Sequence, residues 1–139
     1  MADNRILAGA SQAVAVSALR AQQARMRIIA ENLANANSTS RTPGGDPYRR
    51  QAPVFEPTKV GDAMGVRMSR VEPDPSEFKT EFEPGHPSAD ASGYVKMPNV
   101  DTMVEAMDMR DAQRAYEANL NVIETSRAIE MRTLDLLKR

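Results

Sequence analysis

The residues of this sequence that could do chemistry are few and scattered. His86 is the only histidine, and it lies in the turn-forming sequence Pro84-Gly85-His86-Pro87, where only scattered carboxylates could act with it. A general base or a metal site needs partner groups held in a fixed geometry. We therefore expect His86 to lie in a loop that contacts a neighbouring chain, and a metal-binding or general-base role is the weaker alternative.

Three acidic residues, Glu105, Asp108 and Asp111, are spaced so that one side of a helix would hold them close together. Paired carboxylates can act as acid and base, but a solvated or salt-bridging helix surface has the same spacing, and we favour that interpretation. The Gly44-Gly45 pair does not predict a phosphate-binding loop, because no Lys-Ser or Lys-Thr follows it. The sequence therefore predicts neither an enzyme nor a cofactor or metal site.

The composition excludes further classes of function. The length of 139 residues allows one ordinary domain. With 4% aromatic residues, no Trp and 9 Pro, however, the chain has few large side chains from which to build a compact core. Lys and Arg number 18 and Asp and Glu 19, whereas a nucleic-acid-binding protein usually has a basic excess or stripe. The chain has no Cys, and hence neither disulfides nor thiol chemistry. We expect no nucleic-acid partner.

The longest uninterrupted pattern lies at the C-terminal end, where residues 101–138 contain neither Pro nor Gly. It predicts a helix of about 55 Å, assigned to residues 100–139, that Asn99 or Asp101 could cap. Its apolar residues form two displaced stripes at helical spacing, and a helix with two stripes needs partners on more than one side. The first stripe comprises Met109, Ala112, Tyr116, Leu120, Ile123, Leu134 and Leu137. The second stripe comprises Val104, Met107, Ala115, Ala118, Val122, Ile129 and Leu136.

Residues 1–37 predict a second long helix, because apolar and small side chains fill one broad arc of it. This arc contains Ile6, Leu7, Ala10, Val14, Ala18, Ala21, Ile28, Ile29, Leu33 and Ala36. Arg5 and the apolar run after it resemble a secretory signal, but polar residues dilute the run and the helical phase continues past Arg20. We expect neither a cleaved signal nor a membrane span, since the run is too short and too polar to cross a bilayer.

Residues 38–99, between the two helices, are rich in Pro and in turn-forming residues. Residues 52–56 and the alternation around Val66, Met68 and Val71 predict a small, irregular β hairpin, and Phe78 and Phe82 lie near a second weak strand. We expect residues 84–99 to form a loop. The predicted fold class is mainly α, with long terminal helices paired as a coiled-coil-like hairpin and a small β and loop middle.

Two helices and a small middle cannot bury both apolar arcs, and soluble monomers rarely expose such large apolar patches. We therefore expect other chains to cover them. The Arg49-Arg50 pair and the acidic residues 72–92 are candidates for polar contacts between subunits, with ordinary solvated charges as the alternative. The residues expected to pack between subunits are Leu7, Val14, Ile28, Ile29, Leu33, Tyr116, Leu120, Ile123, Ile129, Leu134 and Leu137.

Residues 32–39, NLANANST, resemble the N-terminal signature of the flagellar axial proteins, the family of rod, hook and hook-associated subunits. Three further segments are similar to the short proximal rod proteins of that family: 42–51 (TPGGDPYRRQ), 83–100 (EPGHPSADASGYVKMPNV) and 113–119 (QRAYEAN). The resemblance spans nearly the whole chain, and residues 59–80 are its least distinctive part. The motif residues are Asn32, Leu33, Ala34, Asn35, Asn37, Pro43, Tyr48, Arg49, Arg50, Pro84, Gly85, His86, Pro87, Gly93, Tyr94, Pro98, Asn99, Tyr116 and Asn119.

This resemblance implies a structural subunit of the basal-body rod, the drive shaft of the flagellum that crosses the periplasm. Such subunits leave the cell through the flagellar type III export apparatus without a cleaved signal. Their terminal helices then pack with other rod proteins and further copies into a tube around the export channel. The implied neighbours are rod adaptor and export-gate proteins and the inner-membrane ring, without direct membrane insertion. Two alternatives are a secreted helical adaptor or effector that binds a single partner without polymerising, and a small enzyme that uses His86.

Overall fold

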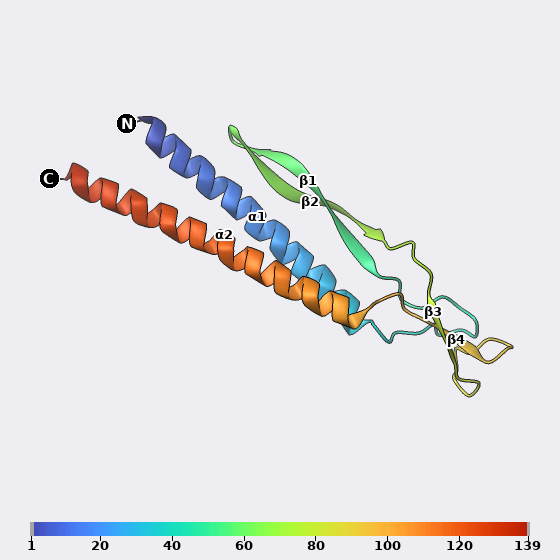
Figure 1. Ribbon diagram of the computed structural model, residues 1–139. Coiled ribbons are helices and arrows are strands. Elements are labelled where there is room, and N and C mark those ends of the chain that lie inside the picture. Colours follow the sequence, from blue (N-terminus) through green and yellow to red (C-terminus); the bar gives the residue numbers. More distant parts are fainter. Residues whose placement is uncertain (1, 139) are drawn as a thin grey trace. The chain divides into compact units, whose positions relative to one another are not determined.

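The computed structural model describes the backbone of residues 2–138 and the side chains of residues 9–138. Two long helices occupy the ends of the chain and two small β hairpins lie between them in the sequence (Figure 1). The prediction of a mainly α chain with a small β middle is confirmed at this level. The elements in order are α1 (Ala2–Ala34), β1 (Gln51–Val60), β2 (Ala63–Pro73), β3 (Lys79–Phe82), β4 (Tyr94–Met97) and α2 (Thr102–Leu137).

The chain divides into two compact units, which we name the helical unit and the loop unit. The helical unit comprises residues 2–26, 54–70 and 111–138 of the described part. It therefore holds most of α1, most of the β1–β2 hairpin and most of α2. The loop unit comprises residues 27–53 and 71–110. It holds the last turns of α1, the first turns of α2, the β3–β4 hairpin and the connecting loops.

Polar side chains end α1 and begin α2, as the sequence suggests. The Asn35 side-chain amide donates to the Glu31 carbonyl at 2.9 Å, and the Ser38 hydroxyl donates to Asn35 Oδ1 at 3.0 Å. At the start of α2, Asp101 Oδ1 accepts from the N–H of Met103 at 3.0 Å and of Val104 at 3.3 Å. Of the two capping residues that the sequence allows, Asp101 is therefore the N-cap.

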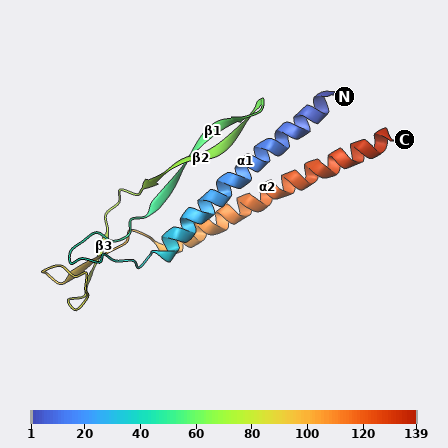
Figure 2. The same ribbon diagram turned by 180° about the vertical axis from the view of Figure 1, so that it is seen from behind.

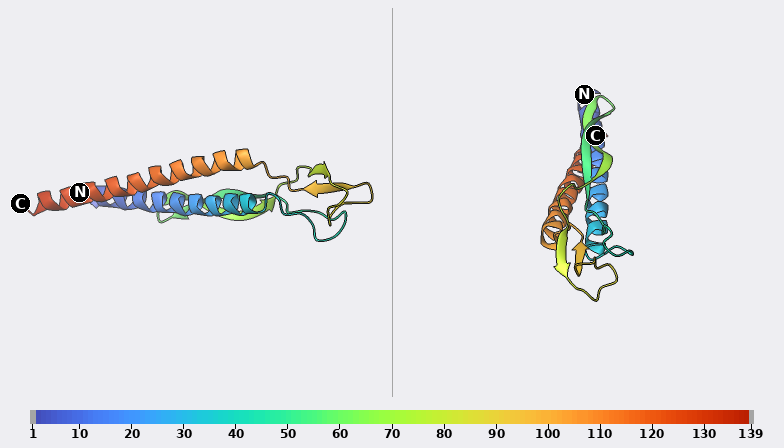
Figure 3. Two further views of the ribbon diagram at one scale, coloured as in Figure 1. Left: turned by 90° about the horizontal axis from the view of Figure 1, so that it is seen from below. Right: turned by 90° about the vertical axis from the view of Figure 1, so that its right-hand side faces the viewer.

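Within the helical unit, α1 and α2 run antiparallel, and the start of α1 and the end of α2 lie at the same end of the helix pair (Figures 1 and 3). The β1–β2 hairpin runs along α1 on the side away from α2, as the view from behind also shows (Figure 2). The unit buries small side chains of α1 and two side chains of α2, so its core is narrow. The buried apolar residues here are Ala15, Ala21, Ala112 and Ile123.

The β1–β2 hairpin is longer than the alternation in the sequence predicts, with strands of 10 and 11 residues. One anchor to α1 is the Ser17 hydroxyl, which accepts from the N–H of Val66 at 3.2 Å. The backbone approaches α1 so closely at Gly65 that a Cβ there would lie 2.4 Å from the Ser17 hydroxyl oxygen. Contact with the helix extends a strand pair whose own sequence, interrupted by Pro53 and Pro57, only weakly favours β structure.

The loop unit contains a second hairpin that corrects the expectation of a loop over residues 84–99. Strand β3 pairs with β4 in antiparallel register, from Lys79 opposite Met97 to Phe82 opposite Tyr94. Val95 of β4 is 1% exposed, and this burial favours the strand that local sequence does not reveal. The loop between β3 and β4 is joined to the loop between α1 and β1 by a hydrogen bond from the Gly44 N–H to the Ser88 carbonyl at 3.1 Å.

Candidate assembly surfaces and the polar cluster that supports them

Asn32, in the last turn of α1, is the centre of a polar cluster in the loop unit and is 1% exposed. Its Oδ1 accepts from the Tyr48 hydroxyl at 2.8 Å and from the Gln51 N–H at 2.9 Å. Its Nδ2 donates to the Gln51 carbonyl at 2.8 Å and to Glu105 Oε2 at 3.4 Å. Burial and the negative charges of Glu31 and Glu105 raise the pKa of Tyr48, so its hydroxyl stays a donor.

Arg50 ties this cluster to the start of α2. Its Nε donates to Glu105 Oε1, and the side chain of Glu105 is 1% exposed. Its Nη1 lies 3.2 Å from Asp74 Oδ2, and its Nη2 lies 3.9 Å from Asp108 Oδ2. The backbone N–H of Arg50 donates to Asn99 Oδ1 at 2.8 Å. The guanidinium therefore holds three separated segments of the loop unit together.

The packing of the cluster shifts the pKa values of Arg50 and Asp74. Burial alone would lower the pKa of Arg50, but hydrogen bonding to Glu105 and its charge, together with Asp74, raise it overall. Hydrogen bonds from the backbone and side chain of Ser76 lower the pKa of Asp74, burial opposes them, and the hydrogen bond and charge of Arg50 lower it further. Both groups are thus held in their charged forms over the ordinary pH range.

Asn99 and Arg49 extend the cluster to the segment after β2. The Asn99 amide donates to the Asp74 carbonyl at 3.2 Å and to the Ser76 carbonyl at 3.1 Å. Arg49 Nη1 donates to the same two carbonyls at 2.7 and 2.9 Å, and its guanidinium lies 4.1 Å from the centre of the Phe78 ring. The Arg49-Arg50 pair was a candidate for polar contacts between subunits, with ordinary solvated charges as the alternative. Both guanidinium groups have partners within the chain, so they are not ordinary solvated charges, and a contact between subunits stays a prediction.

Motif residues from three separate parts of the sequence therefore lie in one hydrogen-bonded cluster: Asn32, Tyr48, Arg49, Arg50 and Asn99. Sequence reasoning missed a further member, Glu105, which it assigned to a solvated or salt-bridging helix surface. Glu105 does form a salt bridge, but it is buried rather than solvated. One feature of the sequence could have identified Glu105 as a member of the cluster. It lies in the first turn of α2, shortly after the motif residue Asn99.

The other motif residues have smaller roles. His86 lies in a turn, where its Nδ1 accepts from the Ser88 N–H at 3.0 Å. Among the described residues, no group of three or more His, Cys, Asp or Glu is arranged to hold a metal ion. The Asn119 amide donates to the Ala115 carbonyl of its own helix at 2.8 Å. Gly93 and Pro98 are buried, Leu33, Asn35 and Tyr116 are half-buried, and Ala34, Asn37, Pro43, Pro84, Gly85, Pro87 and Tyr94 are exposed.

The two stripes of α2 differ in their surroundings. Ala112 and Ile123 of the first stripe are 0% and 8% exposed, and Tyr116 is half-buried. Farther along that stripe Leu120, Leu134 and Leu137 remain 37%, 40% and 54% exposed. The large members of the second stripe are exposed throughout: Val104 47%, Met107 60%, Val122 46%, Ile129 53% and Leu136 72%. The first stripe thus serves partly as the chain's own core, and the second is an unpartnered apolar surface.

The expected packing residues of α1 are placed mostly inside the chain. Ile28 and Ile29 are 4% and 3% exposed, and Val14 and Leu33 are half-buried. The side chain of Leu7 lies outside the described residues. Their role between subunits stays a prediction, and the exposed residues of α2 are the stronger candidates. No helix in the described part of the chain combines the length and apolar content that a membrane span requires.

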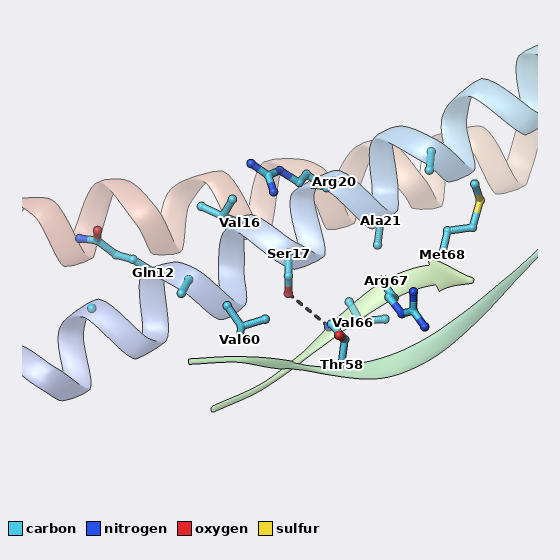
Figure 4. Close-up of a pocket in the computed structure, with 13 residues that line it drawn as sticks. Gln12, Val16, Ser17, Arg20, Ala21, Thr58, Val60, Val66, Arg67 and Met68 are labelled. Carbon is cyan, nitrogen blue, oxygen red and sulfur yellow. Dashed lines mark hydrogen bonds between the residues drawn. The ribbon is translucent and has the colours of Figure 1, made fainter. Parts of the chain in front are cut away.

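A groove of about 710 Å³ lies between α1 and the β1–β2 hairpin of the helical unit (Figure 4). Small and aliphatic side chains form most of its lining, including Ala21, Val60 and Val66. Arg20 and Arg67, which line it as well, are both exposed. The Nε2 atom of Gln12, another lining residue, is buried and has no hydrogen-bond partner among the described residues. The groove is an apolar recess with donor groups around it.

Comparison with known proteins gives consistent matches over nearly the whole chain. Residues 13–41 match the family model described as flagella basal body rod protein, and residues 91–136 match flagellar basal body rod FlgEFG protein C-terminal. The flagellar basal-body rod protein FlgC of Agrobacterium fabrum is 46% identical over 131 residues, with 93% of this chain and 94% of that protein covered. FlgC of Salmonella typhimurium is 43% identical (88% and 92% covered), and FlgC of Bacillus subtilis is 32% identical (90% and 95% covered).

Proposed function

The chain belongs to the FlgC family of flagellar basal-body rod proteins and is a structural subunit of the rod, and we propose that it polymerises through its two terminal helices. The observation that carries this proposal is the exposed second stripe of α2, which nothing within the described chain covers. Water-exposed Val, Ile, Met and Leu side chains at helical spacing favour burial against another helix. Other rod proteins and further copies of this chain would supply that surface.

The pairing of α1 and α2 as a coiled-coil-like hairpin is part of this proposal. Antiparallel α1 and α2 within the helical unit support it (Figure 3), as does the burial of Ala112 and Ile123 on one side of α2. A hairpin of this kind buries only one stripe on each helix. The second stripe would then remain for contacts between subunits. We assign residues 1–37 and 100–139 to the core of the assembly and residues 38–99 to its Pro-rich middle segment.

A drive shaft must transmit torque without slip, and long helices packed side by side at many small contacts suit that task. Family membership supports the remaining parts of the proposal. These are a tubular assembly around the export channel, export through the flagellar type III apparatus without a cleaved signal, and a location in the basal body within the periplasmic space. The proposed neighbours are rod adaptor and export-gate proteins and the inner-membrane ring.

The two alternatives from the sequence are less well supported. The relatives reported above are rod proteins, and they give no support to a secreted adaptor that binds a single partner. They are also not enzymes, which agrees with a purely structural role for this chain. For His86 we propose a structural role in its turn, because its Nδ1 accepts the Ser88 N–H instead of facing a second functional side chain.

The experiment that tests polymerisation uses the purified full-length chain together with other purified flagellar rod proteins. Light scattering and electron microscopy at rising concentration should show tubes or helical fragments. A single-partner adaptor would give a complex of fixed mass at every concentration. A fixed mass across the whole concentration range would contradict the proposal.

A further inference from the structure

We propose that the exposed tip of the β3–β4 hairpin of one copy docks into the groove between α1 and the β1–β2 hairpin of a second copy. The aromatic tip is defined by Phe82 and Tyr94, and the groove by the residues that line it in Figure 4. The inference rests on the proposed rod function, because it names one contact through which subunits would join. It concerns a pair of surfaces distinct from the second stripe of α2.

The aromatic tip has the properties of an anchor. Phe82 and Tyr94 are 63% and 47% exposed, although both are large and largely apolar. They stand directly opposite each other in the register of the hairpin, with ring centres 5.2 Å apart in an edge-on contact. Because the rings already hold each other, little side-chain freedom remains to be lost on binding. Aromatic residues that are ordered before binding are typical centres of protein interfaces.

The groove offers a matching recess. Its floor on α1 includes the small residues Ala13, Ala21 and Ala24. Its wall on the hairpin includes Val60 and Val66 (Figure 4). None of its lining residues is aromatic, and the groove encloses about 710 Å³. That volume lies within the range of sites that bury a bulky apolar group.

The charges around the two surfaces are complementary. Exposed Glu81 and Glu83 flank Phe82 in the sequence. Arg20 and Arg67 line the groove and are exposed, and the buried amide of Gln12 lacks an acceptor among the described residues. Carboxylates that approach with the aromatic tip would therefore meet two guanidinium groups and one unpaired N–H donor.

Cations near the aromatic tip do not reverse this balance. Lys96 of β4 lies 3.2 Å from Asp46 and is paired within its own copy. Lys79, at the start of β3, is preceded by Glu77 and followed by Glu81, and all three side chains are exposed. Of the arginines at the groove, Arg67 has only a weak contact, at 3.9 Å, with the exposed Glu56. It can turn to a new carboxylate at little cost.

The aromatic tip and the groove are different surfaces, so a contact between them is heterologous. A copy that offers its groove to one neighbour still offers its aromatic tip to the next. Such contacts generate rings or helical arrays instead of closed two-fold dimers. A subunit of a tubular rod needs this kind of interface.

Disulfide trapping tests the proposal, because the chain has no Cys and introduced thiols are unambiguous. Thr80→Cys places a thiol on the same side of β3 as Phe82, and Thr58→Cys places one in the groove. Lys59→Cys, on the opposite side of β1, is the matched control. Two single-Cys proteins, one carrying a mass tag, are expressed together in a strain from which the gene for this subunit has been deleted. Basal bodies are isolated from cells whose swimming the two proteins restore, and these are oxidised.

We expect a mixed Thr80–Thr58 dimer several-fold more abundant than the Thr80–Lys59 product, and Phe82→Ala should reduce it to the control level. A strain that swims and assembles rods without this dimer overturns the docking and leaves the rod function intact. Failure of the unmodified chain to assemble overturns both. A third outcome would also overturn the proposal. If a chain with both Cys substitutions forms a disulfide within one copy, and the mixture of single-Cys chains gives no dimer, the aromatic tip occupies the groove of its own chain.

Charge reversal tests independently whether the charged residues take part in the contact. Arg20→Glu combined with Arg67→Glu should weaken the cross-link by roughly tenfold, since two rim contacts become repulsive. Glu81→Lys combined with Glu83→Lys in the other copy should restore it. Weakening without restoration, or no weakening at all, would contradict the assignment of these charges to the contact.

Discussion

The guanidinium of Arg50 is hydrogen-bonded to the carboxylate of Glu105, which lies 55 positions later in the chain and is 1% exposed. The pair joins the segment before β1 to the first turns of α2 within the loop unit. A buried ion pair adds little compared with a well-packed apolar pair, but removal of one partner leaves an uncompensated charge. The loop unit is therefore sensitive to the loss of either partner of this pair.

Glu105→Ala should lower the free energy of unfolding of the loop unit by about 2–4 kcal/mol. We expect a value below the largest reported for buried pairs, because the side chain of Arg50 is 23% exposed and keeps its contact with Asp74. Hydrogen exchange of the amides of residues 27–53 and 71–110 measures the loss. Glu117→Ala, on an exposed part of α2, is the control and should change stability by less than about 0.5 kcal/mol. Equal effects of the two changes would show that the pair is not structural.

The stability of the loop unit should fall in acid because of Asp74. Its pKa in the folded chain is lowered from 3.8, so the unfolded chain binds its proton more readily. The contribution of Asp74 is therefore complete above its unfolded pKa and is lost as the pH falls through the lower folded pKa. Exchange protection measured between about pH 5 and pH 2 should show this loss. In Asp74→Asn the same titration should be flatter, and an unchanged slope would assign the acid sensitivity to other carboxylates.

Both terminal helices were predictable from the sequence because the evidence for them is local. Periodic apolar residues and the absence of Pro and Gly define α2, and Asp101 caps it as one of two candidates. The coiled-coil-like pairing of the helices could not be settled in this way and stays a proposal. The strand at Tyr94–Met97 was missed for a physical reason, since four residues carry little periodicity and the partner β3 lies across a long loop.

The candidate surfaces were predictable in kind but not in detail. The sequence shows two apolar stripes on α2, yet only packing decides that Ile123 is buried and Ile129 is exposed. Similarly, the motif residues Asn32, Arg50 and Asn99 could be named, whereas their meeting at Glu105 depends on long-range closure of the loop unit. Charge counting could not separate Arg49 and Arg50, which have partners within the chain, from solvated arginines.

Tyr48→Phe should destabilise the loop unit by about 1–2 kcal/mol, because the variant leaves one acceptor site of the buried Asn32 amide empty. The phenyl ring keeps the packing, so the loss reports the hydroxyl alone. Hydrogen exchange of the Gln51 amide is the most direct readout, since its N–H donates to the same Asn32 oxygen. Tyr94→Phe is the matched control, because Tyr94 lies outside this cluster. A loss of equal size in the control would contradict the assignment.

Ile129→Asp should abolish assembly while the chain itself still folds. Ile129 is 53% exposed in the second stripe, so a carboxylate there meets water in the isolated chain but would be desolvated in a packed rod. Asn121→Asp adds the same charge on the polar side of α2 and serves as the control. Swimming and the yield of basal bodies measure assembly, and helix content by circular dichroism checks folding. Normal swimming of the Ile129 variant would remove the main support for packing through the second stripe.

Gly93→Ala should distort the β3–β4 hairpin, and Gly85→Ala should not. Gly93 has a φ of +86°, and a Cβ there would lie 2.9 Å from Cε2 of Phe82. The strained backbone alone costs about 1–2 kcal/mol, and the Phe82 ring, which contacts Tyr94, must also shift. A Cβ at Gly85 meets no atom within 4 Å. The measurement is the exchange rate of the Glu83 amide, which donates to the Gly93 carbonyl at 3.0 Å. Faster exchange in the Gly93 variant alone is expected, whereas equal rates in both variants would mean that the left-handed turn does not hold the aromatic pair in place.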